Sequence, residues 1–149
     1  MIIKKSIDIE NEVRLALETY LTAYCRPLPA VYELPNILIT QVGGTSKDTI
    51  DTFQVVLDAR ADTEAEALSY LNYATAILVA TAKEQSTHIR HVVVNSFGSW
   101  GNDPVRPDLA MCSARLEVVA HQYKEEIDPG QLNGLDYITD EQGAYIVAR

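Results

Sequence analysis

Three histidines, His88, His91 and His121, are the side chains of this sequence best suited to hold a metal or to transfer protons near neutral pH. His88 and His91 lie three residues apart where a strand is expected to begin, and strand side chains at that offset point to opposite faces. No Cys-x-x-Cys or His-Glu-x-x-His pattern accompanies them. The sequence therefore predicts no metal site, and His91 is expected to be a sheet or interface residue.

Two cysteines, Cys25 and Cys112, are the candidate nucleophiles, and each would need a histidine as its base. Cys112 falls on the apolar side of an alternating pattern, where a cysteine is expected to be a small core residue. A disulfide between the two stays open as an alternative. Acidic pairs fall at a helix start and in a polar tail, where such charges are normally solvated: Glu64 with Glu66, and Glu125 with Glu126. We therefore predict no catalytic residue and no cofactor.

A glycine-rich segment, Gly43-Gly44-Thr45-Ser46-Lys47, resembles a phosphate-binding loop in composition. A P-loop needs Gly-x-x-x-x-Gly-Lys-Ser/Thr between a strand and a helix, so that backbone amides and a helix N-terminus converge on the phosphate. Here the spacing differs and a strand follows. We interpret residues 43–51 as the polar, mobile tip of a β-hairpin, with Gly43, Gly44 and Lys47 as candidate interface residues.

A second loop is expected from residue 97 to residue 108, and it contains the only tryptophan of the chain. Aromatic side chains in such a loop are costly to leave in water. The loop therefore either folds back over the sheet or packs on a partner, where Trp and Arg are enriched. Both alternatives stay open. The candidate interface residues here are Phe97, Trp100, Asp103 and Arg106.

The elements that must position these residues follow from hydrophobic periodicity. Asp8 is a typical helix N-cap, and apolar residues then recur at helical spacing, which predicts a helix over residues 8–25. The run ends before Pro27, which cannot continue a helix. β-Branched residues predict a strand at 37–42, and alternation predicts another at 52–60, so that the two form a hairpin.

A capping box at residues 63–66 begins an alanine-rich helix that is expected to reach Lys83. Two further strands are predicted at 89–95 and at 109–121. The order is thus helix-strand-strand-helix-strand-strand. It predicts an α+β fold with a four-stranded, mainly antiparallel sheet and two helices on one face.

The chain has 149 residues, which suits one domain, and its net charge is −9, from 12 basic and 21 acidic residues. We expect a single domain at 1–123 and an acidic C-terminal extension at 124–149, with a strand-like segment at 144–147. The charge argues against tight DNA binding and against an anionic membrane surface. No apolar run approaches the ~20 residues of a membrane span, and the acidic start predicts no secretory signal.

The layout resembles that of the tail terminator (tail completion) proteins of long-tailed bacteriophages and prophages, which are minor tail proteins. The resemblance covers residues 8–122 and not the extension that begins at Lys124. The segments that carry it are the opening helix, the strand start Leu34-Pro35-Asn36-Ile37-Leu38-Ile39, the Gly43-Gly44 turn, the alanine-rich helix after Asp58-Ala59-Arg60, and Asp103-Pro104-Val105-Arg106-Pro107 leading into Ala114-Arg115-Leu116-Glu117-Val118.

The resemblance implies a structural protein that forms a homohexameric ring, caps the tail tube, stops its elongation and offers a docking surface to the head. The implied partners are further copies of the chain, the tail tube protein and a head-completion or neck protein. DNA would pass through the channel without specific binding, and the protein would reside in the virion tail after assembly in the host cytoplasm. The alternatives are a tail tube or neck component, or a small-molecule-binding α+β domain or enzyme.

Overall fold

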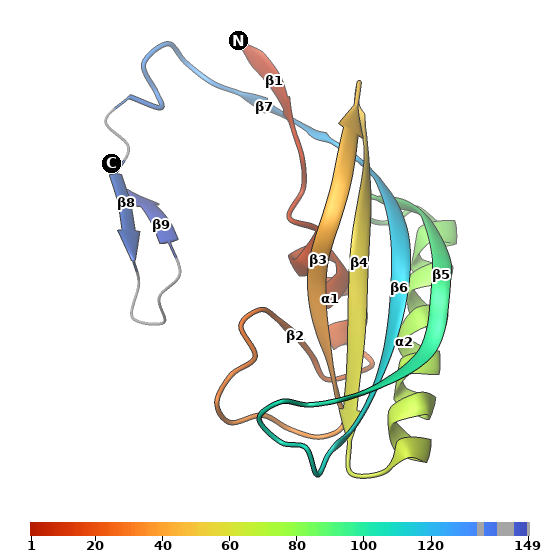
Figure 1. The fold of residues 1–149 in the computed structure, drawn as a ribbon. Coiled ribbons are helices and arrows are strands. Elements are labelled where there is room, and N and C mark those ends of the chain that lie inside the picture. Colours follow the sequence, from red (N-terminus) through yellow and green to blue (C-terminus); the bar gives the residue numbers. More distant parts are fainter. Residues whose placement is uncertain (134–135, 140–144, 149) are drawn as a thin grey trace. The chain divides into compact units, whose positions relative to one another are not determined.

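A computed structural model of the chain describes residues 1–133, 136–139 and 145–148 (Figure 1). The chain divides into a main unit, Ser6–Tyr123, and a terminal unit made of Met1–Lys5 and Lys124–Arg149. Asp140, Glu141 and Ala144, which the sequence assigned to the acidic extension and its strand-like end, lie outside the described residues.

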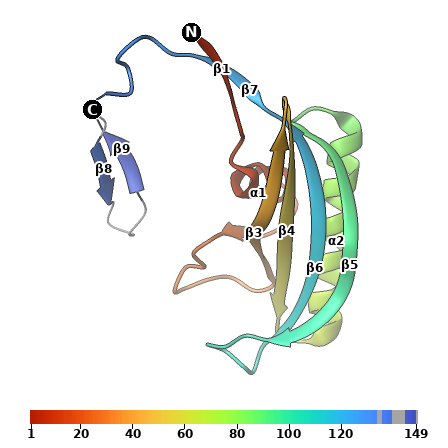
Figure 2. The ribbon, with the colours of Figure 1, turned by 45° about the horizontal axis from the view of Figure 1, so that its top comes forward.

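The main unit holds a five-stranded mixed sheet with two helices on the same face (Figures 1 and 2). The strand order is β2-β3-β4-β6-β5, in which β2 runs parallel to β3 and the other neighbours are antiparallel. The elements are α1 (Ile9–Glu18), β2 (Ala23–Cys25), β3 (Asn36–Lys47), β4 (Ile50–Ala61), α2 (Glu64–Glu84), β5 (Ile89–Asn102) and β6 (Ala110–His121).

The terminal unit consists of short strands. β1 (Ile2–Lys5) pairs with β7 (Tyr123–Glu126), and β8 (Asp136–Thr139) pairs antiparallel with β9 (Tyr145–Ala148). The amino group of Met1 donates a hydrogen bond of 3.0 Å to the carbonyl oxygen of Ile127. The sequence placed residues 1–5 with the main domain, but in the structure they pair with the C-terminal segment.

The α+β class with two helices is confirmed, but the four-stranded, mainly antiparallel sheet and the predicted element order are wrong. The helix expected at 8–25 ends at Glu18, where the amides of Tyr20 and Leu21 both donate to the carbonyl oxygen of Leu17. Residues 23–25 then form β2, because they pair with residues 37–39 of β3. Helical spacing of apolar residues could not reveal a strand whose hydrogen bonds all go to a distant segment.

Strand β5 is twice as long as predicted and replaces the first half of the loop expected at 97–108. Its pairing with β6 shifts register between Ile89 and His91, between Val94 and Ser96, and again between Phe97 and Ser99. Such bulges insert an extra residue and break the two-residue alternation that marks a strand in a sequence. The second half of the strand was missed because its alternation is interrupted three times.

The β3–β4 hairpin is also more regular than expected, so the loop predicted at 43–51 is wrong. The ladder continues to the pair Lys47 and Ile50, which leaves a two-residue turn with Asp48 in the left-handed region at φ 56°. The side-chain amide of Gln122 donates to Ser46 and to Asp51, both at 2.9 Å. The mobility of this tip stays a prediction.

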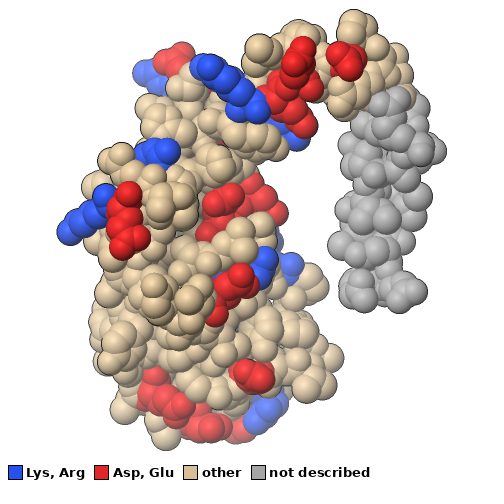
Figure 3. All heavy atoms as spheres, turned by 180° about the vertical axis from the view of Figure 1, so that it is seen from behind, with Lys and Arg blue, Asp and Glu red and all other residues tan. Residues whose placement is uncertain are grey.

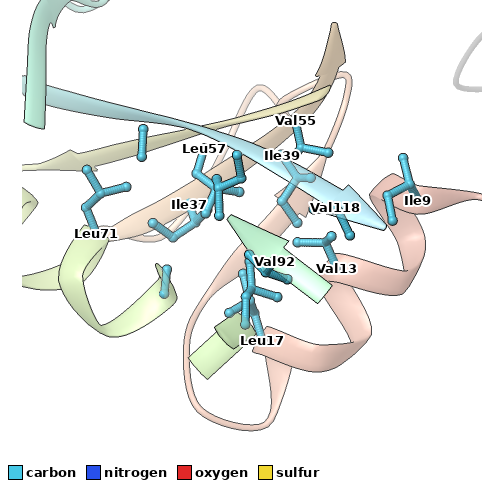
Figure 4. Close-up of a cluster of buried hydrophobic side chains, with 14 of the residues drawn as sticks. Ile9, Val13, Leu17, Ile37, Ile39, Val55, Leu57, Leu71, Val92 and Val118 are labelled. Carbon is cyan, nitrogen blue, oxygen red and sulfur yellow. The ribbon is translucent and has the colours of Figure 1, made fainter. Parts of the chain in front are cut away.

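The hydrophobic core lies between the sheet and the helices (Figure 4). α1 turns three fully buried side chains into it, Ile9, Val13 and Leu17, and α2 adds its own stripe. Each buried aliphatic side chain contributes roughly 1.5–3 kcal/mol. The sheet side of the core consists of alternating residues, among them Ile37, Ile39, Val55, Leu57, Leu116 and Val118.

We expect Thr63→Ala to lower the free energy of unfolding by about 1 kcal/mol, because the variant loses the N-cap of α2. The Thr63 side chain accepts a hydrogen bond of 3.2 Å from the amide of Glu66, as the capping box predicts. Urea unfolding followed by circular dichroism measures the change. Thr63→Ser keeps the oxygen and is the control, so equal losses in both variants would contradict a capping role.

Candidate functional site

The predicted interface residues do not gather in one place. Gly43, Gly44 and Lys47 belong to β3, with Lys47 at the hairpin turn. Phe97 and Trp100 lie on the edge strand β5, and Asp103 and Arg106 lie in the segment that joins β5 to β6. Gly44 has a local reason, because a Cβ there would lie 3.0 Å from the carbonyl oxygen of Thr52.

Asp103 is 3% exposed and organises the segment between β5 and β6. Its Oδ2 accepts a hydrogen bond of 2.6 Å from Nε of Arg60, and its Oδ1 accepts from the amides of Val105 at 2.8 Å and Arg106 at 3.2 Å. Burial raises the pKa of Asp103, but Arg60 and the two amides outweigh burial and hold the pKa below its ordinary value. Asp103 therefore fixes the segment from within and does not present its carboxylate at the surface.

Arg106 is different, because its guanidinium lies at the surface. It donates to both carboxylate oxygens of Asp108, at 3.2 and 3.0 Å, with both side chains about half-exposed or more. Exposed pairs of this kind contribute little to stability. The cationic group is thus held in place by a neighbour while it stays accessible.

Phe97 and Trp100 are 43% and 47% exposed. The register places Phe97 opposite Ala114 and Trp100 opposite Cys112. Both residues lie on a strand and stay half-exposed, which contradicts a loop folded back over the sheet, whereas packing on a partner stays a prediction. Trp100 also lines a cavity of about 480 Å³, together with acidic and polar residues that include Asp62, Glu64, Asn102 and Asp108. We refer to Phe97 and Trp100 as the β5 edge.

Sequence reasoning missed an aromatic groove beside α2. It has a volume of about 600 Å³ and is lined mainly by apolar surface, with Tyr20 71% and Tyr73 62% exposed. The hydroxyl oxygen of Tyr70 accepts a hydrogen bond of 2.5 Å from the amide of Thr22, which fixes one wall. We call this site the helical groove; its residues are Tyr20, Leu21, Glu66, Ser69, Tyr70, Tyr73 and Ile77.

A signal for the groove was present in the sequence of α2. Tyr70, Tyr73 and Ile77 form a second apolar stripe beside the buried stripe that contains Leu71 and Leu78. A helix with apolar residues on more than one side carries more apolar surface than packing against a single sheet can bury. Tyr20 was hidden because it was assigned to a helix that ends before it.

Helix α2 separates the helical groove from the β5 side of the sheet. A third cavity, of about 410 Å³, lies between α2 and β5, and its residues include Asn72, Ala76 and Val79 of α2 and Val94 of β5. These α2 residues differ from those that line the groove. The main unit therefore exposes apolar side chains in two separate places.

The described charges and thiols indicate no further centre. Seen from behind (Figure 3), Lys and Arg are scattered among Asp and Glu without a basic stripe. Both cysteines are free, and burial raises the pKa of the Cys25 and Cys112 thiols, which disfavours the thiolate. Within residues 1–133, 136–139 and 145–148, no group of three or more His, Cys, Asp or Glu could hold a metal ion. No helix in that part of the chain could cross a membrane.

The sequence matches no protein-family model and no curated protein. The geometry of the exposed surfaces is therefore what supports a function for this chain.

Proposed function

We propose that this chain is a structural protein of a phage tail that forms a homohexameric ring, caps the tail tube, stops its elongation and provides the head-docking surface. The observation that carries the proposal is the presence of two sets of exposed aromatic side chains on different elements, those of the helical groove and those of the β5 edge. A ring of identical subunits needs two different surfaces that fit each other, because each subunit contacts one neighbour with each surface.

The residue types at these surfaces support an interface. Aromatic residues are the side chains that most often dominate binding energy in the centre of a protein–protein contact. Tyr20 and Tyr73 line a concave site, whereas Phe97 and Trp100 lie half-exposed on an edge strand. We propose that the β5 edge of one subunit occupies the helical groove of the next.

The uncovered face of the sheet supports a channel lining. Side chains on this face alternate with the buried ones and are mostly polar, as with Thr52 and Gln54 of β4 and Ser113 and Glu117 of β6. In the proposed ring this polar face would line the channel. Together with the negative net charge of the chain, it would let DNA pass without binding. The proposed partners are the tail tube protein and a head-completion or neck protein.

A second candidate function is small-molecule binding. The helical groove, at about 600 Å³ and mainly apolar, falls within the ordinary size range of ligand sites. A ligand-binding domain would remain a monomer, whereas a terminator would form rings. Native mass spectrometry and negative-stain electron microscopy of the purified chain separate the two.

We expect the ring fraction to rise with salt between 0.01 M and 0.1 M, where the Debye length falls from about 30 Å to about 10 Å. Subunits with a net charge of −9 repel one another, and salt screens that repulsion. Sedimentation velocity measures the ring fraction, and retention of duplex DNA is measured in parallel at low salt. Tight DNA binding that weakens with salt would overturn the acidic channel and favour a nucleic-acid role.

A further inference from the structure

A small cavity lies between two segments of the main unit that are distant in the sequence. Residues 28–32 come from the connection between β2 and β3, and residues 103–105 follow β5. Its volume is about 300 Å³. We call it the loop pocket; its residues are Leu28, Pro29, Ala30, Tyr32, Arg60, Asp103, Pro104 and Val105.

Arg60 is the only cationic residue among those that line the loop pocket, and its hydrogen bonding is incomplete. The residue is 6% exposed, and its Nε donates to Asp103 at 2.6 Å. Its Nη1 is buried and has no acceptor among the described residues. Because Nη1 is closed off from solvent, an oxygen atom reaches it only after the rim or the Arg60 side chain shifts. A buried guanidinium donor without an acceptor is costly, so that contact would be favourable.

The net charge of the Arg60–Asp103 pair decides which kind of acceptor oxygen, charged or neutral, the pocket would bind. Asp103 already neutralises Arg60, so a carboxylate would add a second, uncompensated negative charge in a buried place. A peptide carbonyl oxygen accepts the same hydrogen bond without bringing a net charge. The other walls, such as Leu28, Pro29 and Pro104, suit an apolar side chain next to that carbonyl.

We propose that the loop pocket is a docking site for an apolar peptide segment of a partner protein, which places a backbone carbonyl oxygen on the guanidinium of Arg60. The rim supports this occupant. Val105, which lines the pocket, is 84% exposed, and Val31, which lies between two lining residues, is 90% exposed. Asp103 holds this rim in place through its bonds to the amides of Val105 and Arg106. The site is separate from the surfaces of the proposed ring and does not depend on it.

The test uses a matched pair of probes on the full ¹⁵N-labelled chain, with NMR signals of the Arg60 guanidinium as the readout. N-acetyl-leucine methylamide offers a neutral carbonyl beside an apolar side chain, and N-acetyl-leucine offers the same side chain with a carboxylate. We expect a saturable shift of the Arg60 Nε–Hε signal with the methylamide, and at least about tenfold weaker binding of the carboxylate.

Variants connect the shift to the pocket. Val105→Glu should weaken binding of the methylamide at least about tenfold, because it removes apolar rim and adds a charge. Val42→Glu, at a valine of β3 that is 49% exposed, is the matched control and should leave binding unchanged. The absence of any saturable shift, equal binding of the carboxylate, or an equal loss in Val42→Glu would each overturn the proposal.

Discussion

Replacing Asp103 by alanine is expected to lower the free energy of unfolding by about 3–5 kcal/mol, because it leaves the buried guanidinium of Arg60 without its counter-charge. Arg60 and Asp103 are 6% and 3% exposed, and the ion pair joins β4 to the segment that follows β5. The same substitution removes the acceptor for the amides of Val105 and Arg106. Chemical denaturation at neutral pH measures the loss.

Two variants show whether the effect comes from the buried pair. Asp108→Ala removes an exposed carboxylate that also pairs with an arginine, and it should leave the melting temperature nearly unchanged. The double variant Arg60→Met with Asp103→Leu removes both charges and should recover much of the stability lost by Asp103→Ala. A double variant no more stable than Asp103→Ala would contradict the argument.

The loss caused by Asp103→Ala should also depend on pH. The folded protein holds the pKa of Asp103 below its ordinary value, which in unfolded chains is about 3.9. A lowered pKa contributes stability that is present above the unfolded pKa and is lost as pH falls through the folded one. The difference between the wild-type protein and the variant should therefore be constant above about pH 5 and shrink below about pH 4. If the stability difference between the wild-type protein and Asp103→Ala did not change over this pH range, the proposed role of the lowered Asp103 pKa would be contradicted.

The parts of the fold that the sequence could predict are those decided by neighbouring residues. The caps at Asp8 and Thr63 depend on a contact three residues away, and both are present. The alternation of β4 and β6 reports one buried face directly, so both strands were found close to their true bounds. The start of α1 was predicted correctly, but its end was not.

The parts that could not be predicted depend on contacts between distant segments. β2 is a strand only because β3 lies beside it, and β1 pairs with β7 from the other end of the chain. In β5 three bulges hide the strand pattern. The candidate site shows the same limit. Asp103 was proposed as an interface residue, but its partner Arg60 lies 43 residues away, and only the fold reveals that the two are buried together.

A mixing experiment tests the proposed ring most sharply, because a ring contact joins two different surfaces. Tyr73→Glu places a charge in the helical groove, and Trp100→Glu places one at the β5 edge. Both residues are exposed by about half or more, so the subunits are expected to stay folded. Each variant alone should be a monomer, since each has lost one of the two surfaces that every contact requires.

Mixed in equal amounts, the two variants should form a heterodimer and stop there. The intact edge of the Tyr73→Glu subunit fits the intact groove of the Trp100→Glu subunit, and the two surfaces left over are both disabled. Native mass spectrometry of variants with different isotope labels measures this directly, and Val42→Glu should still form rings. If Trp100→Glu dimerised alone, the groove would bind a second groove, which is a self-complementary contact that closes a pair and cannot build a ring.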